Sequence, residues 1–246
     1  MKKLVMGLAL CSLIFASCSD DDDAAQVIVP DAGVLSGGPF TFCVDDEAST
    51  VSGITTDPNA VGTNRTFVIT DDAGMILGLP PNNEALEGVN FDDAGPGVCL
   101  IWYLRYEDGI EGLDAGMNAN NLSGSFDLSN SIMVTRNEPD AGTLSGGPFT
   151  FAIDGTPDNV SGITTDPNAV GTNRMFVITD EDGMILGTPP DNAALEGVDF
   201  DGAGVGVCFI YYLRSEDGLT GAEMGADIDD LEGCFSLSNS IRVDRN

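Results

Sequence analysis

One long internal duplication limits the fold of this chain more than any other feature. The segment DAGVLSGGPFTF at the start of 31–137 recurs as DAGTLSGGPFTF at the start of 140–246, an offset of 109 residues that continues without a gap. About two thirds of the aligned positions are identical, and each copy has 107 residues, the usual size of an independently folding domain. The sequence therefore predicts two domains of one fold, here called unit 1 (31–137) and unit 2 (140–246), joined through Glu138 and Pro139.

Apolar residues in each unit follow the period of β-strands. In unit 1, Phe40 and Phe42 share one face of an alternating run, and 67–79 has the pattern of a hairpin. The segment GVCLIWYLRYED (97–108) is apolar on both faces, which predicts a central strand. Shorter runs lie at 51–56, 89–91, 125–128 and 132–136, and 110–122 is the one place expected to hold a helical turn. Seven or eight strands in roughly 100 residues predict an all-β protein with two tandem immunoglobulin-like β-sandwich domains.

The first 17 residues have the pattern of a signal peptide. Lys2 and Lys3 precede an uncharged apolar run of 13 residues (4–16). A membrane-spanning helix needs about 20 apolar residues, so this run is too short to remain as a transmembrane anchor. The sequence therefore predicts that 1–17 directs export and is removed.

The residues ASC at 16–18 resemble the lipobox of bacterial lipoproteins, with phenylalanine where leucine is more usual. This resemblance implies that Cys18 becomes the first mature residue and carries a diacylglycerol on its sulfur, a modification of the palmitate class. Two or three acyl chains hold a protein firmly to a bilayer. Cys11 fits the lipobox less well because the bulky Leu10 precedes it. The alternative is an ordinary cleaved signal followed by a free secreted protein.

The residues after Cys18 are strongly acidic. The run SDDDD (19–23) resembles the export signal of surface lipoproteins of the Bacteroidota, which implies an outer-membrane location facing the extracellular side. The alternative is a solvated acidic spacer, because like charges repel and stay extended. In either interpretation 18–30 is a flexible tether, whose reach after the lipidated cysteine is roughly 40 Å.

Charge and residue types exclude several classes of function. The sequence has 40 acidic residues against nine basic ones and no histidine, and both of its lysines lie in the predicted signal peptide. Such a surface repels nucleic acid and anionic headgroups. Without histidine, the commonest general base and zinc ligand are missing. Hydrophobic residues make up 42% of the chain, enough for a folded core. The sequence therefore predicts a folded, acidic, non-catalytic protein.

A second resemblance covers nearly the whole of both units. The set GGPFTFCVD, VSGIT, FVITD, GVCLIWYL and FDLSNSI looks like repeat modules in large secreted and surface proteins of the same bacterial group. No activity is assigned to those modules, so the resemblance implies an extracellular module and no particular chemistry.

Four cysteines lie within the two units. Cys99 and Cys208 occupy the same repeat position, whereas Cys43 aligns with an alanine and Cys234 with a serine. Outside the cytoplasm this distribution favours one disulfide per unit, Cys43 to Cys99 and Cys208 to Cys234. The central-strand position would then have to lie within about 7 Å, measured between Cα atoms, of both other positions. The alternative is that one or both pairs are buried free thiols.

Calcium is the one cofactor that the acidic loops suggest, because it takes six to eight oxygen ligands. No loop has the EF-hand spacing, and the alternative is that Asp and Gly simply form turns. The candidate ligands are the acids shared by both units: Asp45, Asp57, Asp92, Asp108, Asp154, Asp166, Asp201 and Asp217.

Three further features recur in both units. Trp102 and Tyr211 could form a platform for stacking sugars, although core packing is the alternative on a two-sided apolar strand. The loop 51–65 is identical to 160–174 while the residues before it have diverged, which suggests either a binding role or recent duplication. The arginines that recur are each expected to pair with a carboxylate: Arg65, Arg105, Arg136, Arg174, Arg214 and Arg245.

Taken together, these patterns predict a cell-surface lipoprotein that displays two non-catalytic β-sandwich modules with a structural or adhesive role. The alternative is a surface lipoprotein that binds a glycan or calcium.

Overall fold

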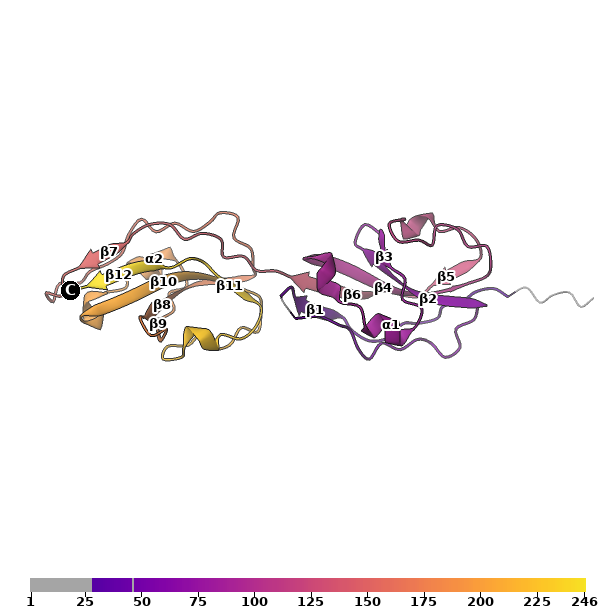
Figure 1. Ribbon diagram of the computed structural model, residues 1–246, viewed down its shortest axis with the longest axis horizontal. Coiled ribbons are helices and arrows are strands. Elements are labelled where there is room, and N and C mark those ends of the chain that lie inside the picture. Colours follow the sequence, from indigo (N-terminus) through magenta and orange to yellow (C-terminus); the bar gives the residue numbers. More distant parts are fainter. Residues whose placement is uncertain (1–27, 46) are drawn as a thin grey trace, which may run out of the picture.

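The computed structural model describes residues 28–45 and 47–246. The predictions for the signal peptide, Cys18 and most of the tether lie outside these described residues. The chain is mostly β and forms two similar domains that follow one another along the long axis of the molecule (Figure 1). Each domain is built around a sheet whose strands all come from one unit, as the duplication predicts.

Unit 1 forms a six-stranded sheet with the order β1-β6-β4-β2-β3, and β5 also pairs with β4. Its strands are β1 (Phe40–Cys43), β2 (Asn64–Asp71), β3 (Ile76–Gly78), β4 (Gly97–Tyr106), β5 (Phe126–Leu128) and β6 (Ile132–Asn137). β1 runs parallel to β6, and every other pair is antiparallel. β3 therefore lies at one edge of the sheet and β1 at the other.

Unit 2 repeats this topology with the order β7-β12-β10-β8-β9 and with β11 paired to β10. Its strands are β7 (Phe149–Phe151), β8 (Asn173–Asp180), β9 (Ile185–Gly187), β10 (Gly206–Ser215), β11 (Phe235–Leu237) and β12 (Ile241–Arg245). The helical segments of the two units are α1 (Asn83–Glu87), η1 (Phe91–Ala94), η2 (Ala119–Asn121), α2 (Asn192–Glu196), η3 (Asp201–Ala203) and η4 (Ile228–Asp230).

The prediction that 97–108 forms a central strand is confirmed by β4, which has neighbours on both sides and apolar clusters on both faces. Ile101 and Tyr103 belong to the larger cluster, which lies between the sheet and the segments that cover it. Leu104 lies in a second cluster on the opposite face, beneath the segment that contains Ile110 and Leu113. Each unit is therefore sandwich-like, with one sheet covered on both sides.

Two of the predicted strands are wrong. Segment 51–56 contributes only an isolated bridge between Thr55 and Ser36, and 89–91 leads into η1. Val51 and Ile54 are both buried in the larger cluster, but they are three residues apart, whereas a strand turns every second side chain to the same face. The layer over that face therefore consists of irregular segments and not of a second hydrogen-bonded sheet.

Helix α1 was not predicted, because its five residues are too few to show a period. Its start is nevertheless visible in the sequence, since Asn82 follows two prolines and its side chain accepts a hydrogen bond from the Ala85 N–H at 2.9 Å. Leu86 is the one buried residue of α1 and joins the larger cluster. Capping, the apolar contact of Leu86 and a hydrogen bond from the Asn83 side chain to the Ile54 carbonyl oxygen therefore hold this turn of helix in place.

Candidate functional site

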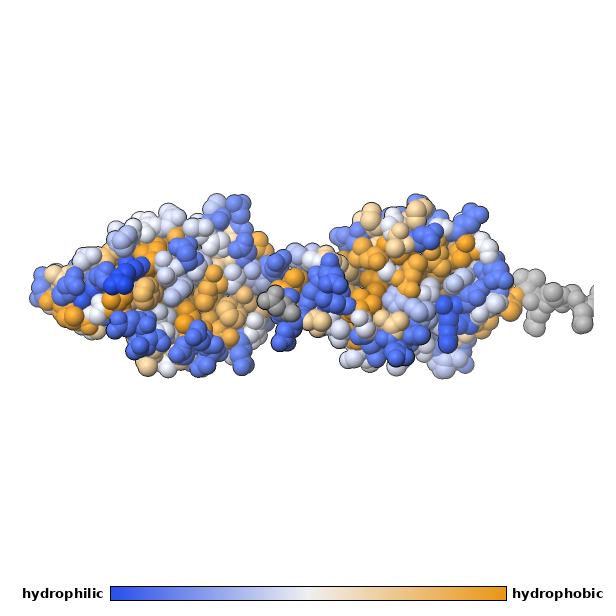
Figure 2. All heavy atoms as spheres, viewed as in Figure 1, coloured by the Kyte–Doolittle hydropathy of each residue, from blue (hydrophilic) through white to orange (hydrophobic). Residues whose placement is uncertain are grey.

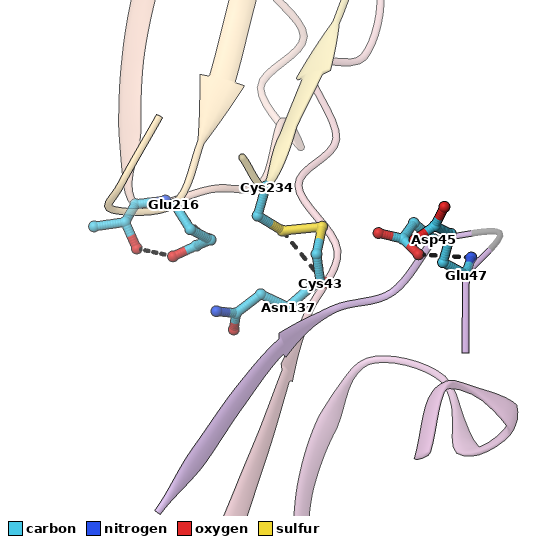
Figure 3. The surroundings of a disulfide bond; sticks show 7 residues. Cys43, Asp45, Glu47, Asn137, Glu216 and Cys234 are labelled. Carbon is cyan, nitrogen blue, oxygen red and sulfur yellow. Dashed lines mark hydrogen bonds between the residues drawn. A yellow bond between two sulfur atoms is a disulfide. The ribbon is translucent and has the colours of Figure 1, made fainter. Parts of the chain in front are cut away.

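A disulfide bond joins Cys43 of unit 1 to Cys234 of unit 2 across the junction between the domains (Figure 3). The two Cα atoms are 5.4 Å apart, within the normal range for a disulfide. Cys43 ends β1 beside Asn137, the last residue of β6, and the Cys234 Sγ lies 3.7 Å from the Asn137 carbonyl oxygen. The linker begins directly after Asn137, so the units are joined by two covalent connections that start next to each other.

This bridge shows that the predicted pairs, Cys43 with Cys99 and Cys208 with Cys234, are wrong. Cys99 and Cys208 are free and buried. The sheet order gives the physical reason in unit 1: β6 lies between β1 and β4, so Cys43 and Cys99 are two strand spacings apart. Two spacings of about 4.8 Å exceed the limit of about 7 Å for a disulfide.

The cysteine positions that differ between the copies follow the geometry of the junction. Cys43 corresponds to Ala152 in unit 2, and Cys234 corresponds to Ser125 in unit 1. Ala152 directly follows β7 and Ser125 directly precedes β5, at the ends of the units that do not face the junction (Figure 1). The cysteines of the bridge therefore occur where one unit faces the other. The sequence shows this difference between the copies, but only the arrangement of the two units shows that Cys43 and Cys234 face each other.

A space of about 800 Å³ that is open to solvent lies at the junction, and residues of both units line it. Its charged residues include Arg136 from unit 1 and Glu216 from unit 2. Arg136 donates hydrogen bonds to the carbonyl oxygens of Phe91 and Gly95, and the Glu216 carboxylate accepts hydrogen bonds from Thr172. Both of these charged groups therefore have partners within their own units, and the other charged residues of the lining, Glu138 and Asp140, are exposed acids at the linker.

The expectation that each recurring arginine pairs with a carboxylate is wrong. Arg105 donates to the carbonyl oxygen of Gly62, and Arg136 donates to carbonyl oxygens although it is only 4% exposed. Within the described residues, the single ion pair joins Arg242 and Asp244 at 2.6 Å. Arg105, Arg136 and Arg214 therefore fasten loop carbonyls to the sheet. In so acidic a chain, most carboxylates are left facing solvent.

The candidate calcium ligands already accept hydrogen bonds, some from their own turn and some from a second segment of the same unit. In unit 1, Asp45 and Asp57 accept backbone hydrogen bonds from residues two positions further along the chain. The other contacts are Asp92 with Ser49, Asp108 with Asn64, Asp154 with Thr156, Asp166 with Asn168, Asp201 with Asp154 and Gly155, and Asp217 with Asn173. No group of three or more His, Cys, Asp or Glu in the described parts of the chain is arranged to hold a metal ion. These acids shape turns or hold two segments of their unit together.

Carboxylates do gather at one end of unit 2. The backbone N–H of Asp154 donates to Asp201, and that of Asp158 donates to Asp199, both over about 3 Å. The pKa of the Asp158 carboxyl is raised by desolvation and by the nearby carboxylates of Asp154, Asp201 and Asp199. Ser49 replaces Asp158 in unit 1, so the two units differ here.

Trp102 and Tyr211 are half-buried and pack against the second apolar cluster of their units. The Trp102 Nε1–H donates to Thr70 Oγ1 at 3.3 Å. The neighbouring aromatic positions, Tyr103 and Tyr212, are each 5% exposed. Both rings proposed for sugar stacking therefore contribute to packing on the second face of the sheet.

Many residues of the identical loop 51–65 are hydrogen-bonded to other segments of unit 1. Val61 exchanges two backbone hydrogen bonds with Asp31, the Thr63 N–H donates to Glu107 at 2.8 Å, and Asn64 donates to Asp108 at 3.0 Å. Unit 2 repeats the Thr–Glu and Asn–Asp contacts. These contacts give the identity of the two loops a structural reason, and they explain why the Glu-Asp pair after β4 recurs.

A glycine beneath this loop provides a test. Gly33 has φ +62°, and an added Cβ would lie 2.5 Å from the Asp57 Cβ, whereas Gly53 has φ +71° with nothing within 4 Å. We expect Gly53→Ala to lower the free energy of unfolding by about 1 kcal/mol through backbone strain alone, and Gly33→Ala by about 2 to 4 kcal/mol because a clash is added. Urea unfolding measures both. Equal effects would contradict the close packing of the loop.

The two free thiols provide a second test. Burial raises the pKa of the Cys99 thiol, which Arg136 opposes, and burial likewise raises the pKa of Cys208. A thiol with a raised pKa remains protonated and unreactive at neutral pH. In a chain with Cys11→Ser and Cys18→Ser, we expect iodoacetamide at pH 7 to label no cysteine in the folded protein, two in guanidinium chloride and four after reduction in guanidinium chloride. Intact mass spectrometry counts the labels, and fast labelling of the folded chain would refute the burial.

The fold and the junction define a protein of two similar β-sheet domains that are covalently bridged. No family model matches the chain, and the comparison with curated proteins finds no match. One structural match is the crystal structure of Drosophila N-cadherin EC1-4, with 9% sequence identity and a TM-score of 0.32. It covers 84% of this chain and 47% of the other, so the chain spans about half the length of that structure. This similarity is too low to transfer a fold or a function.

Proposed function

We propose that this protein is a surface-exposed lipoprotein, anchored through Cys18, whose two non-catalytic modules form a stiff structural or adhesive element outside the cell. The observation that carries the proposal is the Cys43–Cys234 bridge. A bond that joins two domains beside a two-residue linker limits bending and twisting at their junction. A protein that holds a partner or a surface at a set distance needs such a restriction.

The predicted location is compatible with this bridge. Disulfides persist in oxidising compartments and are rare where thiols are kept reduced. The lipobox-like residues 16–18 and the acidic run 19–23 account for export and for anchoring, and 24–30 would separate unit 1 from the membrane. No helix in the described residues is both long and apolar enough to cross a membrane. We also propose that the units are variants of the immunoglobulin-like class of sandwiches in which irregular segments take the place of the second sheet.

Lipidation and display can be tested separately in a bacterium of the predicted group. We expect radiolabelled palmitate to be incorporated into the wild-type chain and into Cys11→Ser, but not into Cys18→Ser. Protease added to intact cells should digest the wild-type units. Replacing the four aspartates of 20–23 by serine should leave palmitate incorporation intact and protect the units from the protease.

Two results would contradict the proposal. Palmitate incorporation into Cys18→Ser would place the anchor elsewhere. Units of the wild-type chain that resist protease on intact cells, but are digested after lysis, would show that they face the periplasm. A lipidated chain with periplasmic units would refute surface display while leaving the anchor in place.

A further inference from the structure

Each unit has an apolar cavity at the same place in its fold. In unit 1 the cavity has a volume of about 620 Å³ and opens between the edge strand β3 and the segment of α1 and η1. In unit 2 a cavity of about 480 Å³ lies between β9 and the segment of α2 and η3. Figure 2 shows apolar residues gathered on the visible face of each unit and surrounded by hydrophilic ones. The sequence patterns did not predict these cavities.

The walls of the two cavities are built from the same repeat positions. Ile69, Val89 and Phe91 line the first cavity, and their counterparts Ile178, Val198 and Phe200 line the second. The free thiols of Cys99 and Cys208 also contribute to the walls. At the mouth, Leu77 is 42% exposed and Leu186 is 36% exposed. Each cavity therefore leads from an exposed leucine on an edge strand to an apolar wall.

The substitutions between the copies keep one carboxylate beside each cavity. Unit 1 has Asn90 and Asp93 in the wall, and unit 2 has Asp199 at the position of Asn90 but Gly202 at the position of Asp93. The acidic residue therefore lies at a different repeat position in each unit, but each cavity wall still contains one. Both carboxylates are exposed, and no arginine lines either cavity. The apolar walls therefore meet negative charge at their mouths.

An apolar wall with a carboxylate at its mouth favours occupants that carry positive charge over occupants that carry negative charge. A fatty acid, an anionic lipid or the acidic tether of another chain would bring negative charge to a carboxylate, and a second copy would add its own formal charge of −31. A basic segment is attracted by the surface, and an apolar side chain within it can enter the cavity and leave water.

We propose that each cavity binds an apolar side chain of a basic peptide segment, so that one chain holds two such segments of a cationic protein or peptide. The carboxylate of Asp93 or Asp199 faces the basic residues beside the inserted side chain, and Leu77 or Leu186 covers its outer surface. This inference goes beyond the proposed surface location, and it holds or fails for the purified full chain regardless of its anchor.

The test uses three synthetic peptides with amidated ends. KKFLKK carries both features, KKSSKK keeps the charge without the apolar side chains, and EEFLEE reverses the charge. We expect isothermal titration at low salt to give two KKFLKK peptides per full chain, with affinity at least tenfold above that of either control peptide. Raising the salt concentration should weaken binding because the attraction between exposed charges is screened.

Variants assign the sites. Leu77→Ser and Leu186→Ser should each reduce the stoichiometry from two to one, and the double variant should abolish binding. Met133→Ser is the matched control, since Met133 is 47% exposed on β6, away from both cavities. It should still bind two peptides. Circular dichroism and thermal unfolding verify that each variant is folded.

Several results would overturn the proposal. Equal binding of KKFLKK and KKSSKK would mean attraction to the acidic surface alone, and equal binding of EEFLEE would remove the role of charge. No binding of KKFLKK at millimolar concentration, or full binding by the folded double variant, would also refute it. Sedimentation of the chain without peptide as a dimer that Leu77→Ser dissociates would show that a second copy occupies the cavity.

Discussion

Replacing Cys43 by serine is expected to lower the free energy of unfolding of the whole chain by about 5 kcal/mol, as long as the two units unfold together. The physical reason is the length of the loop that the bridge closes, because Cys43 and Cys234 are 191 residues apart in sequence. In the chain-entropy description, a cross-link restricts the unfolded chain, and the effect grows slowly with loop length. Guanidinium unfolding of oxidised wild type and variant measures the difference.

The partner variant provides an internal control for this prediction. Cys234→Ser should have the same effect as Cys43→Ser, and the double variant should add little, because all three remove the same bond. The folded variants should also gain freedom at the junction, which small-angle scattering detects as a broader distribution of distances between the units. Additive effects of the two single variants, or an unchanged distance distribution, would contradict a bridge between the units.

Replacing Phe67 by alanine is expected to destabilise unit 1 by about 3 to 5 kcal/mol, the range for removing a buried aromatic side chain. Phe67 is 1% exposed and lies in β2, with its ring centroid 5.2 Å from that of Tyr103 on β4. The variant loses this contact and leaves a cavity within the larger apolar cluster. Urea unfolding followed by circular dichroism measures the loss.

The duplication supplies a matched variant for Phe67→Ala. Phe176 is 1% exposed and lies 5.2 Å from Tyr212, so Phe176→Ala should cost unit 2 a similar amount. NMR signals from each unit show which domain loses structure first. In the reduced chain, the units are joined only by the linker. We therefore expect each substitution to lower the urea concentration at which the unit that carries it is half unfolded. If either substitution lowered the unfolding midpoints of both units equally in the reduced chain, the two units would not have separate cores.

Much of the fold was predictable because several segments carry strong local patterns. The hairpin of β2 and β3 has apolar runs on both sides of an acidic turn, and β4 is apolar on both faces. Segment 51–56 was misassigned because its short apolar run resembles a strand although its inward side chains are three residues apart. The irregular layer over the sheet depends on side-chain contacts from distant segments, such as the bridge between Ser36 and Thr55, and these leave no local period.

The candidate site was predicted less well because its features join residues that are distant in the chain. Cys43 and Cys99 both lie on strands of one sheet, yet β6, which follows them both in sequence, separates them in space. Most of the metal candidates do not gather, for a related reason, and Asp154 and Asp201 are the pair that lies together. A carboxylate in a tight turn is held by N–H groups of its own loop, as Asp57 is, and such local bonds fix it away from other acids.

By itself, the sequence determined that the chain has two copies of one β-rich unit, a buried strand at the centre of each and an acidic surface. These properties follow from repetition, period and composition, which act over short stretches of chain. Only the tertiary structure decided that Cys43 bonds to Cys234 and that each unit keeps a cavity beside its edge strand. Both depend on strand order and on how one unit faces the other, and those arrangements are set by packing between distant segments.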